Sequence, residues 1–272
     1  MPDAPSAHDF PATFRGVLDL LRRLRAPGGC PWDREQTPRT LLPYLIEEAH
    51  EAATAIESGD DEATVDELGD LLLHLAFQIA IAEEEGRFGL EDVAGSLIAK
   101  MVRRHPHVFG DAAYAGAGHQ AMWERLKREE KPAGAAGVIG DLPAALPGLV
   151  RAYRIQQKVA TVGFDWQEPR GAREKVDEEL REVDEAAEGD TVSPERLEEE
   201  FGDLLFALVN WGRLLDLHPE TAVQAANRKF ERRFRELEAL ARTRGLALDS
   251  LSLAELDALW DEVKKAEPGV TG

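Results

Sequence analysis

The chain has 272 residues and a formal net charge of −20, with 52 acidic against 32 basic side chains. This excess of negative charge excludes long polyanions such as DNA or RNA as favourable partners. Its single cysteine, Cys30, rules out an intramolecular disulfide and favours a reducing, cytoplasmic setting. The most apolar stretch, residues 68–82, is shorter than the roughly 20 residues of a membrane span, so we expect no membrane partner.

Apolar residues recur at three- and four-residue spacing along almost the whole chain, which predicts an all-α protein. A stretch rich in Gly, Ala and Pro marks a linker between two halves. We therefore expect an N-terminal domain over residues 12–131, a linker over 132–148 and a C-terminal domain over 149–267. The expected helices span about residues 12–26, 38–57, 61–85, 90–104, 118–130, 147–160, 171–188, 194–216, 219–243 and 252–266.

The two halves carry similar motifs in the same order, which indicates a tandem repeat of one helical bundle. The matching pairs are EEAHE (47–51) with EELRE (178–182), ELGDLLL (67–73) with EFGDLLF (200–206), KMVRR (100–104) with KFERR (229–233), and MWERLKREE (122–130) with LWDEVKKAE (259–267).

The first half places four carboxylates on two successive helices. Glu48 and Glu51 share a helix face because they are three residues apart, and Glu67 and Asp70 do the same on the next helix. Between them, ESGDD (57–61) has the Gly and Asp expected of a helix end and a new N-cap. Residue 59 lies midway between 51 and 67 and between 48 and 70. An antiparallel pair of helices therefore brings all four carboxylates to one level.

The second half repeats this symmetry about residue 191, which lies midway between Glu182 and Glu200 and between Glu179 and Asp203. Carboxylates gathered at one point repel each other and need cations. Oxygen-only ligation suits Mg²⁺, with Mn²⁺ as a substitute. A solvated acidic face would explain one such set, but two sets with the same symmetry favour two metal sites.

A basic pair follows each carboxylate set, Lys100 with Arg104 and Lys229 with Arg233. The i, i+4 spacing puts both members of a pair on one helix face. Lysine and arginine beside a metal suit a phosphate chain. Ordinary salt bridges to nearby glutamates are the alternative explanation.

Lys175 adds a cation four residues before Glu179, whereas Tyr44 stands at the matching position of the first half. We expect Lys175 to strengthen phosphate binding in the second half. Two roles stay open for Trp260 and for its counterpart Trp123: each stacks on a nucleotide base or packs in the apolar stripe of its own helix.

These motifs resemble the signature of the MazG family of nucleoside triphosphate pyrophosphohydrolases, which is EExxE followed by ExxD. The resemblance covers roughly residues 14–265. It implies an all-α fold of the kind shared with dimeric dUTPases, and a homodimer. It also implies Mg²⁺-dependent cleavage of a nucleoside triphosphate to the monophosphate and pyrophosphate.

The resemblance also implies roles by position. Lys229 and Arg233 would hold the phosphates, and Trp260 would lie near the nucleotide. The acid–base group would be one of Glu47, Glu48 and Glu51 or one of Glu178, Glu179 and Glu182, and the sequence does not choose among them. Both carboxylate sets are intact, so the sequence does not say whether one repeat is silent. The implied metal ligands are Glu48, Glu51, Glu67, Asp70, Glu179, Glu182, Glu200 and Asp203.

Two other classes of function fit part of the pattern. A di-iron carboxylate oxidoreductase uses Glu-x-x-His on two helices. Glu47 and His50 match this once, but Arg181 stands where the second half would need the histidine. A non-enzymatic module that sequesters a nucleotide or docks a partner would use the same residues without turnover.

Overall fold

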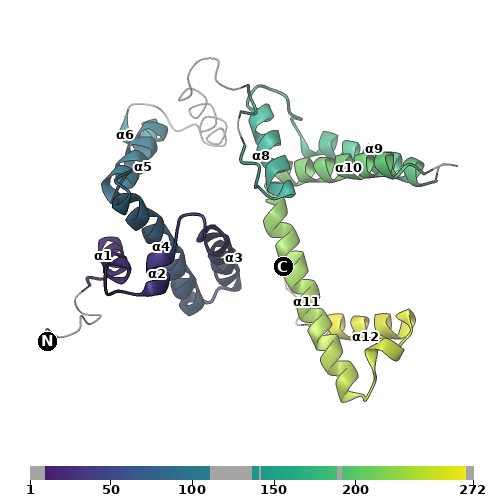
Figure 1. Cartoon of the computed structure of the whole chain (residues 1–272). Coiled ribbons are helices and arrows are strands. Elements are labelled where there is room, and N and C mark those ends of the chain that lie inside the picture. Colours follow the sequence, from purple (N-terminus) through teal and green to yellow (C-terminus); the bar gives the residue numbers. More distant parts are fainter. Residues whose placement is uncertain (1–9, 111–136, 141, 189–191, 268–272) are drawn as a thin grey trace. The chain divides into compact units, whose positions relative to one another are not determined.

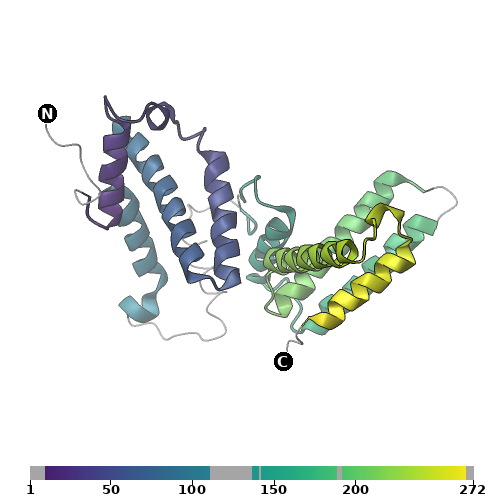
Figure 2. The ribbon, with the colours of Figure 1, turned by 90° about the horizontal axis from the view of Figure 1, so that it is seen from below.

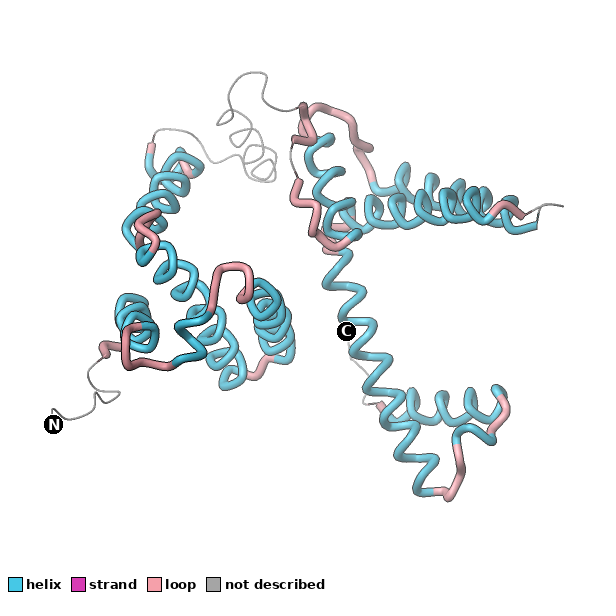
Figure 3. Tube along the Cα trace, in the orientation of Figure 1, coloured by secondary structure: helices cyan, strands magenta, loops and turns pink. Residues whose placement is uncertain are grey.

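The structure is a computed structural model that describes residues 10–110, 137–140, 142–188 and 192–267. Every regular element in these ranges is a helix, as the sequence predicts (Figure 3). The chain divides into two compact units, Met1–Ala113 and Tyr114–Gly272. The helix expected over 118–130, with Trp123, lies outside the described residues. Residues 137–140 and 142–147 of the expected linker form no helix.

The first unit is held together by α4, which packs against α1 and α3 (Figure 1). Leu18 and Leu21 of α1 meet Phe77 and Ile81 of α4 in its core, each at most 3% exposed. Each such side chain contributes about 1.5–3 kcal/mol by leaving water. The helices of this unit are α1 (Phe14–Arg25), α2 (Pro31–Glu35), α3 (Leu42–Ser58), α4 (Asp61–Glu84), α5 (Leu90–Arg104) and α6 (Pro106–Phe109).

The turn between α3 and α4 has the chemistry that ESGDD predicts. Gly59 ends α3 with φ +73°, a left-handed conformation that glycine adopts without a steric penalty. The Asp60 side chain then caps α4 by accepting hydrogen bonds from the amides of Glu62 and Ala63, at 3.0 and 3.1 Å. This short turn makes α3 and α4 an antiparallel hairpin, which sets the register of their carboxylates.

Two local features differ from expectation. Helix α3 begins at Leu42, four residues after the expected start, because Thr37 and Thr40 form a turn of their own. The amide of each threonine donates to the hydroxyl of the other, at 3.0 and 3.2 Å. Helices α2 and α6 were not expected; their first residues, Pro31 and Pro106, have the fixed φ that suits a helix start.

The second unit is built on the α9–α10 pair, with α8 packed against α10 (Figures 1 and 2). The Gln156 side chain of α8 donates to the carbonyl of Phe206 in α10 at 2.8 Å. A second small core, Leu237, Ala241, Leu259 and Val263, joins α11 to α12. The elements are α8 (Gly148–Ala160), α9 (Pro169–Glu188), α10 (Pro194–Leu214), α11 (Pro219–Thr243), the 3₁₀ turn η3 (Leu248–Ser250) and α12 (Leu253–Ala266).

None of the helices in the described ranges combines the length and the apolarity that crossing a membrane requires.

Candidate metal centres

The α3–α4 hairpin gathers three of the four expected carboxylates of the first half. One oxygen each of Glu48, Glu67 and Asp70 lies within 4.8 Å of the others. Glu48 comes from α3, and the other two come from successive turns of α4. Glu51 is exposed and stands outside this group, which we call the first cluster.

The carboxylates of the first cluster repel one another. Burial raises the pKa of Glu48, and the charges of Asp70 and Glu51 raise it further. Burial also raises the pKa of Glu67, again helped by Glu51 and by Glu48. Glu51 therefore acts on the cluster through its charge even though its oxygens lie outside it.

Glu48 also carries a buried oxygen that lacks a partner. Its Oε2 has no hydrogen bond among the described residues, and neither has Nδ1 of the buried His74. His74 Nε2 lies 3.9 Å from the other oxygen, Oε1, which is too far for a hydrogen bond. Burial lowers the pKa of His74, so this ring is neutral at neutral pH and does not offset the carboxylate charge. An unsatisfied buried carboxylate oxygen is costly unless a ligand completes it.

The α9–α10 hairpin forms the second cluster in the matching place. Oxygens of Glu179, Glu182 and Glu200 lie within 4.8 Å of one another, and Glu179 is only 5% exposed. Burial raises the pKa of Glu182, and a hydrogen bond with Glu179 raises it further. Asp203 is exposed and stands outside this cluster.

Two cations reach the second cluster. Lys175 Nζ lies 2.6 Å from Glu179 Oε1 and 2.9 Å from Glu178 Oε1. Arg196 Nε lies 3.5 Å from Glu200 Oε1. Arg196 was not predicted as a site residue, although its i, i+4 spacing to Glu200 is the signal that identifies such a pair. His74, which has the same spacing to Asp70, was not predicted either.

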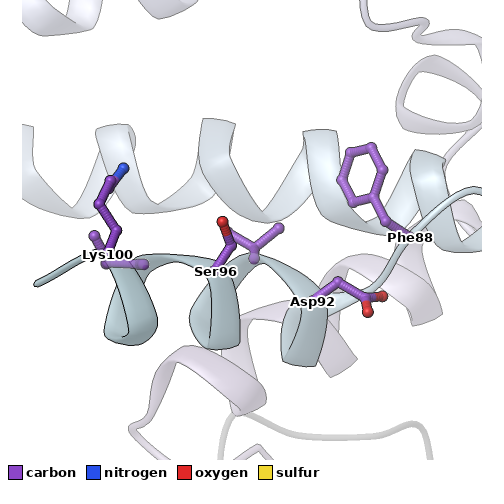
Figure 4. Close-up of a pocket in the computed structure, with 6 residues that line it drawn as sticks. Phe88, Asp92, Ser96 and Lys100 are labelled. Atoms are coloured by element: carbon purple, nitrogen blue, oxygen red, sulfur yellow. The ribbon is translucent and has the colours of Figure 1, made fainter. Parts of the chain in front are cut away.

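The expected phosphate-binding residues of the first half lie on α5. Lys100 lines an open groove of about 500 Å³ together with Phe88, Asp92 and Ser96, which are drawn in Figure 4. The six lining residues all fall between positions 88 and 100, so this groove does not include the first cluster. Arg104 is the last residue of α5 and is half-buried.

The corresponding residues of the second half lie on the α11–α12 pair. Arg233 Nη2 binds Glu267 Oε2 at 2.6 Å. Trp260 packs in the α11–α12 core, with its ring centroid 5.1 Å from that of Phe230. Lys229 is exposed on α11. No contact described for these residues reaches the second cluster.

The donor set of both clusters fits a divalent metal. Each offers three carboxylate oxygens and no sulfur or imidazole within the 4.8 Å group, which is the ligand type preferred by Mg²⁺ and Mn²⁺. Glu48 Oε2 has no hydrogen-bond partner among the described residues, and the pKa values of Glu48, Glu67 and Glu182 are raised. A bound cation would pair with these carboxylates and lower their pKa values.

A known protein family matches this chain twice, once over each of the two hairpins. Residues 36–109 and 167–237 each match the MazG nucleotide pyrophosphohydrolase domain, and each match contains one cluster. The chain is 44% identical over 251 residues to the nucleoside triphosphate pyrophosphohydrolase/pyrophosphatase MazG of Thermotoga maritima, which covers 92% of this chain and 95% of that protein. It is also 44% identical over 254 residues to the nucleoside triphosphate pyrophosphohydrolase of Escherichia coli K12, covering 92% and 97%. YabN of Bacillus subtilis is 41% identical over 261 residues, which are 96% of this chain and 52% of YabN.

Proposed function

Because this chain belongs to the MazG nucleotide pyrophosphohydrolase family, we propose that it hydrolyses nucleoside triphosphates at the α–β bond, giving a nucleoside monophosphate and pyrophosphate. The observation that carries this proposal is the pair of carboxylate clusters, one on each hairpin, within the two matched segments. A triphosphate carries several negative charges, so carboxylates alone would repel it, and a metal must mediate between them.

The proposed metal is Mg²⁺, with Mn²⁺ as a substitute. Glu48, Glu67 and Asp70 would hold it in the first half, with Glu51 completing the set. Glu179, Glu182 and Glu200 would do so in the second half, with Asp203. When bound, the metal supplies positive charge to the phosphate chain and to the departing pyrophosphate.

The acid–base work falls to Glu178, Glu179 and Glu182. One carboxylate of this group orients a water molecule and accepts its proton while the water oxygen bonds to phosphorus and the α–β bridging bond breaks. The raised pKa of Glu182 suits a proton acceptor, because a base works best when its pKa approaches the working pH.

Phosphate binding is assigned to Lys175, Lys229 and Arg233, and in the first half to Lys100 and Arg104. For this role Lys175 must leave Glu179, and Arg233 must leave Glu267. Trp260 is proposed to lie against the base.

A second copy of the chain is the proposed partner. The exposed apolar side chains of α9 and α10 support this, because a monomer gains nothing by leaving them in water. They are Leu180, Phe201, Leu205, Phe206 and Leu208, each at least 40% exposed. We further propose a cytoplasmic location, no nucleic-acid polymer as ligand, and domains over residues 12–131 and 149–267.

Product analysis tests the reaction. Purified protein would be incubated with several nucleoside triphosphates, with Mg²⁺ or with EDTA, and the products separated by ion exchange. Monophosphate and pyrophosphate formed only with the metal are the expected result. Diphosphate and phosphate would show cleavage at the terminal phosphate and overturn the proposed bond. Metal-dependent binding without turnover would favour a nucleotide-sequestering module instead.

A further inference from the structure

The two clusters differ in the charge that the protein itself supplies. In the second cluster, Glu179 is paired with Lys175 at 2.6 Å and Glu200 is paired with Arg196 at 3.5 Å. In the first cluster, no lysine or arginine of the described residues forms an ion pair with Glu48, Glu67 or Asp70. Lys175 stands four residues before Glu179, and Tyr44 stands at the matching position before Glu48. Likewise, Arg196 stands four residues before Glu200, and Ala63 stands at the matching position before Glu67.

Lys175 of the second half and Tyr44 at the matching position of the first half account for this difference in charge. Lys175 is half-buried on α9, and its ammonium group reaches forward along the helix to two successive glutamates, Glu178 and Glu179. Tyr44 instead stacks on His74, with ring centroids 6.2 Å apart and planes 9° from parallel. The first half therefore has an aromatic pair where the second half has a fixed cation.

An ammonium group 2.6 Å from a ligand oxygen competes with a metal for that oxygen and repels the metal's charge. We infer that Lys175 is a built-in counter-ion, so that in the absence of nucleotide the first cluster binds a divalent cation more tightly than the second. The second cluster then fills when a triphosphate arrives, because its phosphates offer Lys175 another anion. This inference rests on the proposed function, since it takes both clusters to be metal sites.

Mn²⁺ titration without nucleotide, with free Mn²⁺ measured by electron paramagnetic resonance, tests this. Glu200→Gln disables the second cluster and isolates the first, and Glu67→Gln isolates the second. We expect the isolated first cluster to bind Mn²⁺ about tenfold more tightly, as one screened unit charge near a divalent ion predicts.

A reciprocal exchange assigns the effect to Lys175. Lys175→Tyr in the Glu67→Gln background should tighten Mn²⁺ binding about tenfold, and Tyr44→Lys in the Glu200→Gln background should weaken it by a similar factor. Tyr44→Phe, which keeps the ring, and Lys264→Tyr, which removes an ion pair of α12 with Asp261, should change neither affinity. Circular dichroism confirms that each variant is folded.

The Mn²⁺ titrations test the counter-ion role of Lys175 separately from the metal-dependent hydrolysis. Equal affinities that respond to neither exchange overturn the counter-ion role and leave the metal sites standing. Absence of Mn²⁺ binding to both isolated clusters overturns the counter-ion role together with the metal-dependent mechanism.

Discussion

His74 Nε2 lies 3.9 Å from Glu48 Oε1, while Glu48 Oε2 is buried without a hydrogen-bond partner in the described structure. Glu48 thus faces a neutral ring and two other carboxylates. The carboxylates of the first cluster repel one another, and a bound cation would offset this repulsion.

A divalent metal should therefore stabilise the protein through Glu48. With Glu200→Gln as the background, Mn²⁺ at about 100 times its dissociation constant should raise the free energy of unfolding by about 2.7 kcal/mol. Adding Glu48→Gln should remove most of this gain and should raise stability without metal, because one repelling charge is gone. Thermal melts with Mn²⁺ and with EDTA measure both effects. Glu168→Gln, at an exposed position, is the matched control. An undiminished metal response in the Glu48→Gln protein would contradict this role.

Arg25 should be a main support of the first unit. Its guanidinium donates to Glu84 at 2.8 and 2.7 Å and to the carbonyls of Asp33 and Gln36 at 2.5 and 3.2 Å, and the residue is 7% exposed. Arg25→Met removes these four hydrogen bonds and should cost about 2–3 kcal/mol in urea unfolding. The exposed neighbour provides the comparison: Arg23→Met should cost less than about 0.5 kcal/mol. Equal costs for the two variants would show that the Arg25 contacts are not stabilising.

Helical periodicity and turn chemistry explain why most of the fold follows from sequence. Helices α5 and α11 have the expected bounds, and α4 and α9 differ by at most two residues at either end. The Gly59–Asp60 turn and the capping serine of α10, Ser193, are local signals that no distant contact overrides. The α2 helix was missed because a five-residue helix has too few residues to show periodicity.

The candidate sites follow from sequence only in part. Mirror symmetry about residues 59 and 191 places the carboxylates at one level, and three of four in each half meet there. Symmetry does not determine which way each side chain turns, so it could not show that Glu51 and Asp203 stand outside. Nor could it show that Lys175 points at Glu179, or that Arg233 is held by Glu267, since these depend on rotamers and on contacts between helices.

The Arg233–Glu267 ion pair predicts a pH-dependent junction between α11 and α12. Hydrogen bonds from Arg233, and next from Arg232, lower the pKa of Glu267 from 4.5 to about 2. A carboxyl group with a lowered folded-state pKa adds stability above its unfolded value of 4.5, and this stability is lost as the pH falls towards 2. Glu267→Gln should therefore unfold at a lower temperature than the parent at pH 7, and the difference should shrink steadily below pH 4.5. A difference that is constant between pH 7 and pH 3 would contradict the assignment.

Lys229 provides a test of phosphate binding, because its exposed position on α11 makes a folding defect unexpected. Lys229→Met should raise the KM for a nucleoside triphosphate about tenfold and change kcat less, as expected for a group that binds the phosphates in ground and transition states alike. Steady-state kinetics would be compared with Lys264→Met, which removes a lysine of α12. Unchanged kcat/KM in the Lys229→Met enzyme would exclude it from the binding site.

We propose that triphosphate hydrolysis takes place at the carboxylate clusters. The most direct test is the turnover of the folded double variant Glu67→Gln/Glu200→Gln with Mg²⁺, compared with the parent enzyme at the same protein concentration. The amide keeps the size of each side chain and removes one ligand charge from each cluster. We expect a loss of at least about 100-fold in monophosphate and pyrophosphate release. Turnover within about twofold of the parent would place the chemistry elsewhere in the molecule.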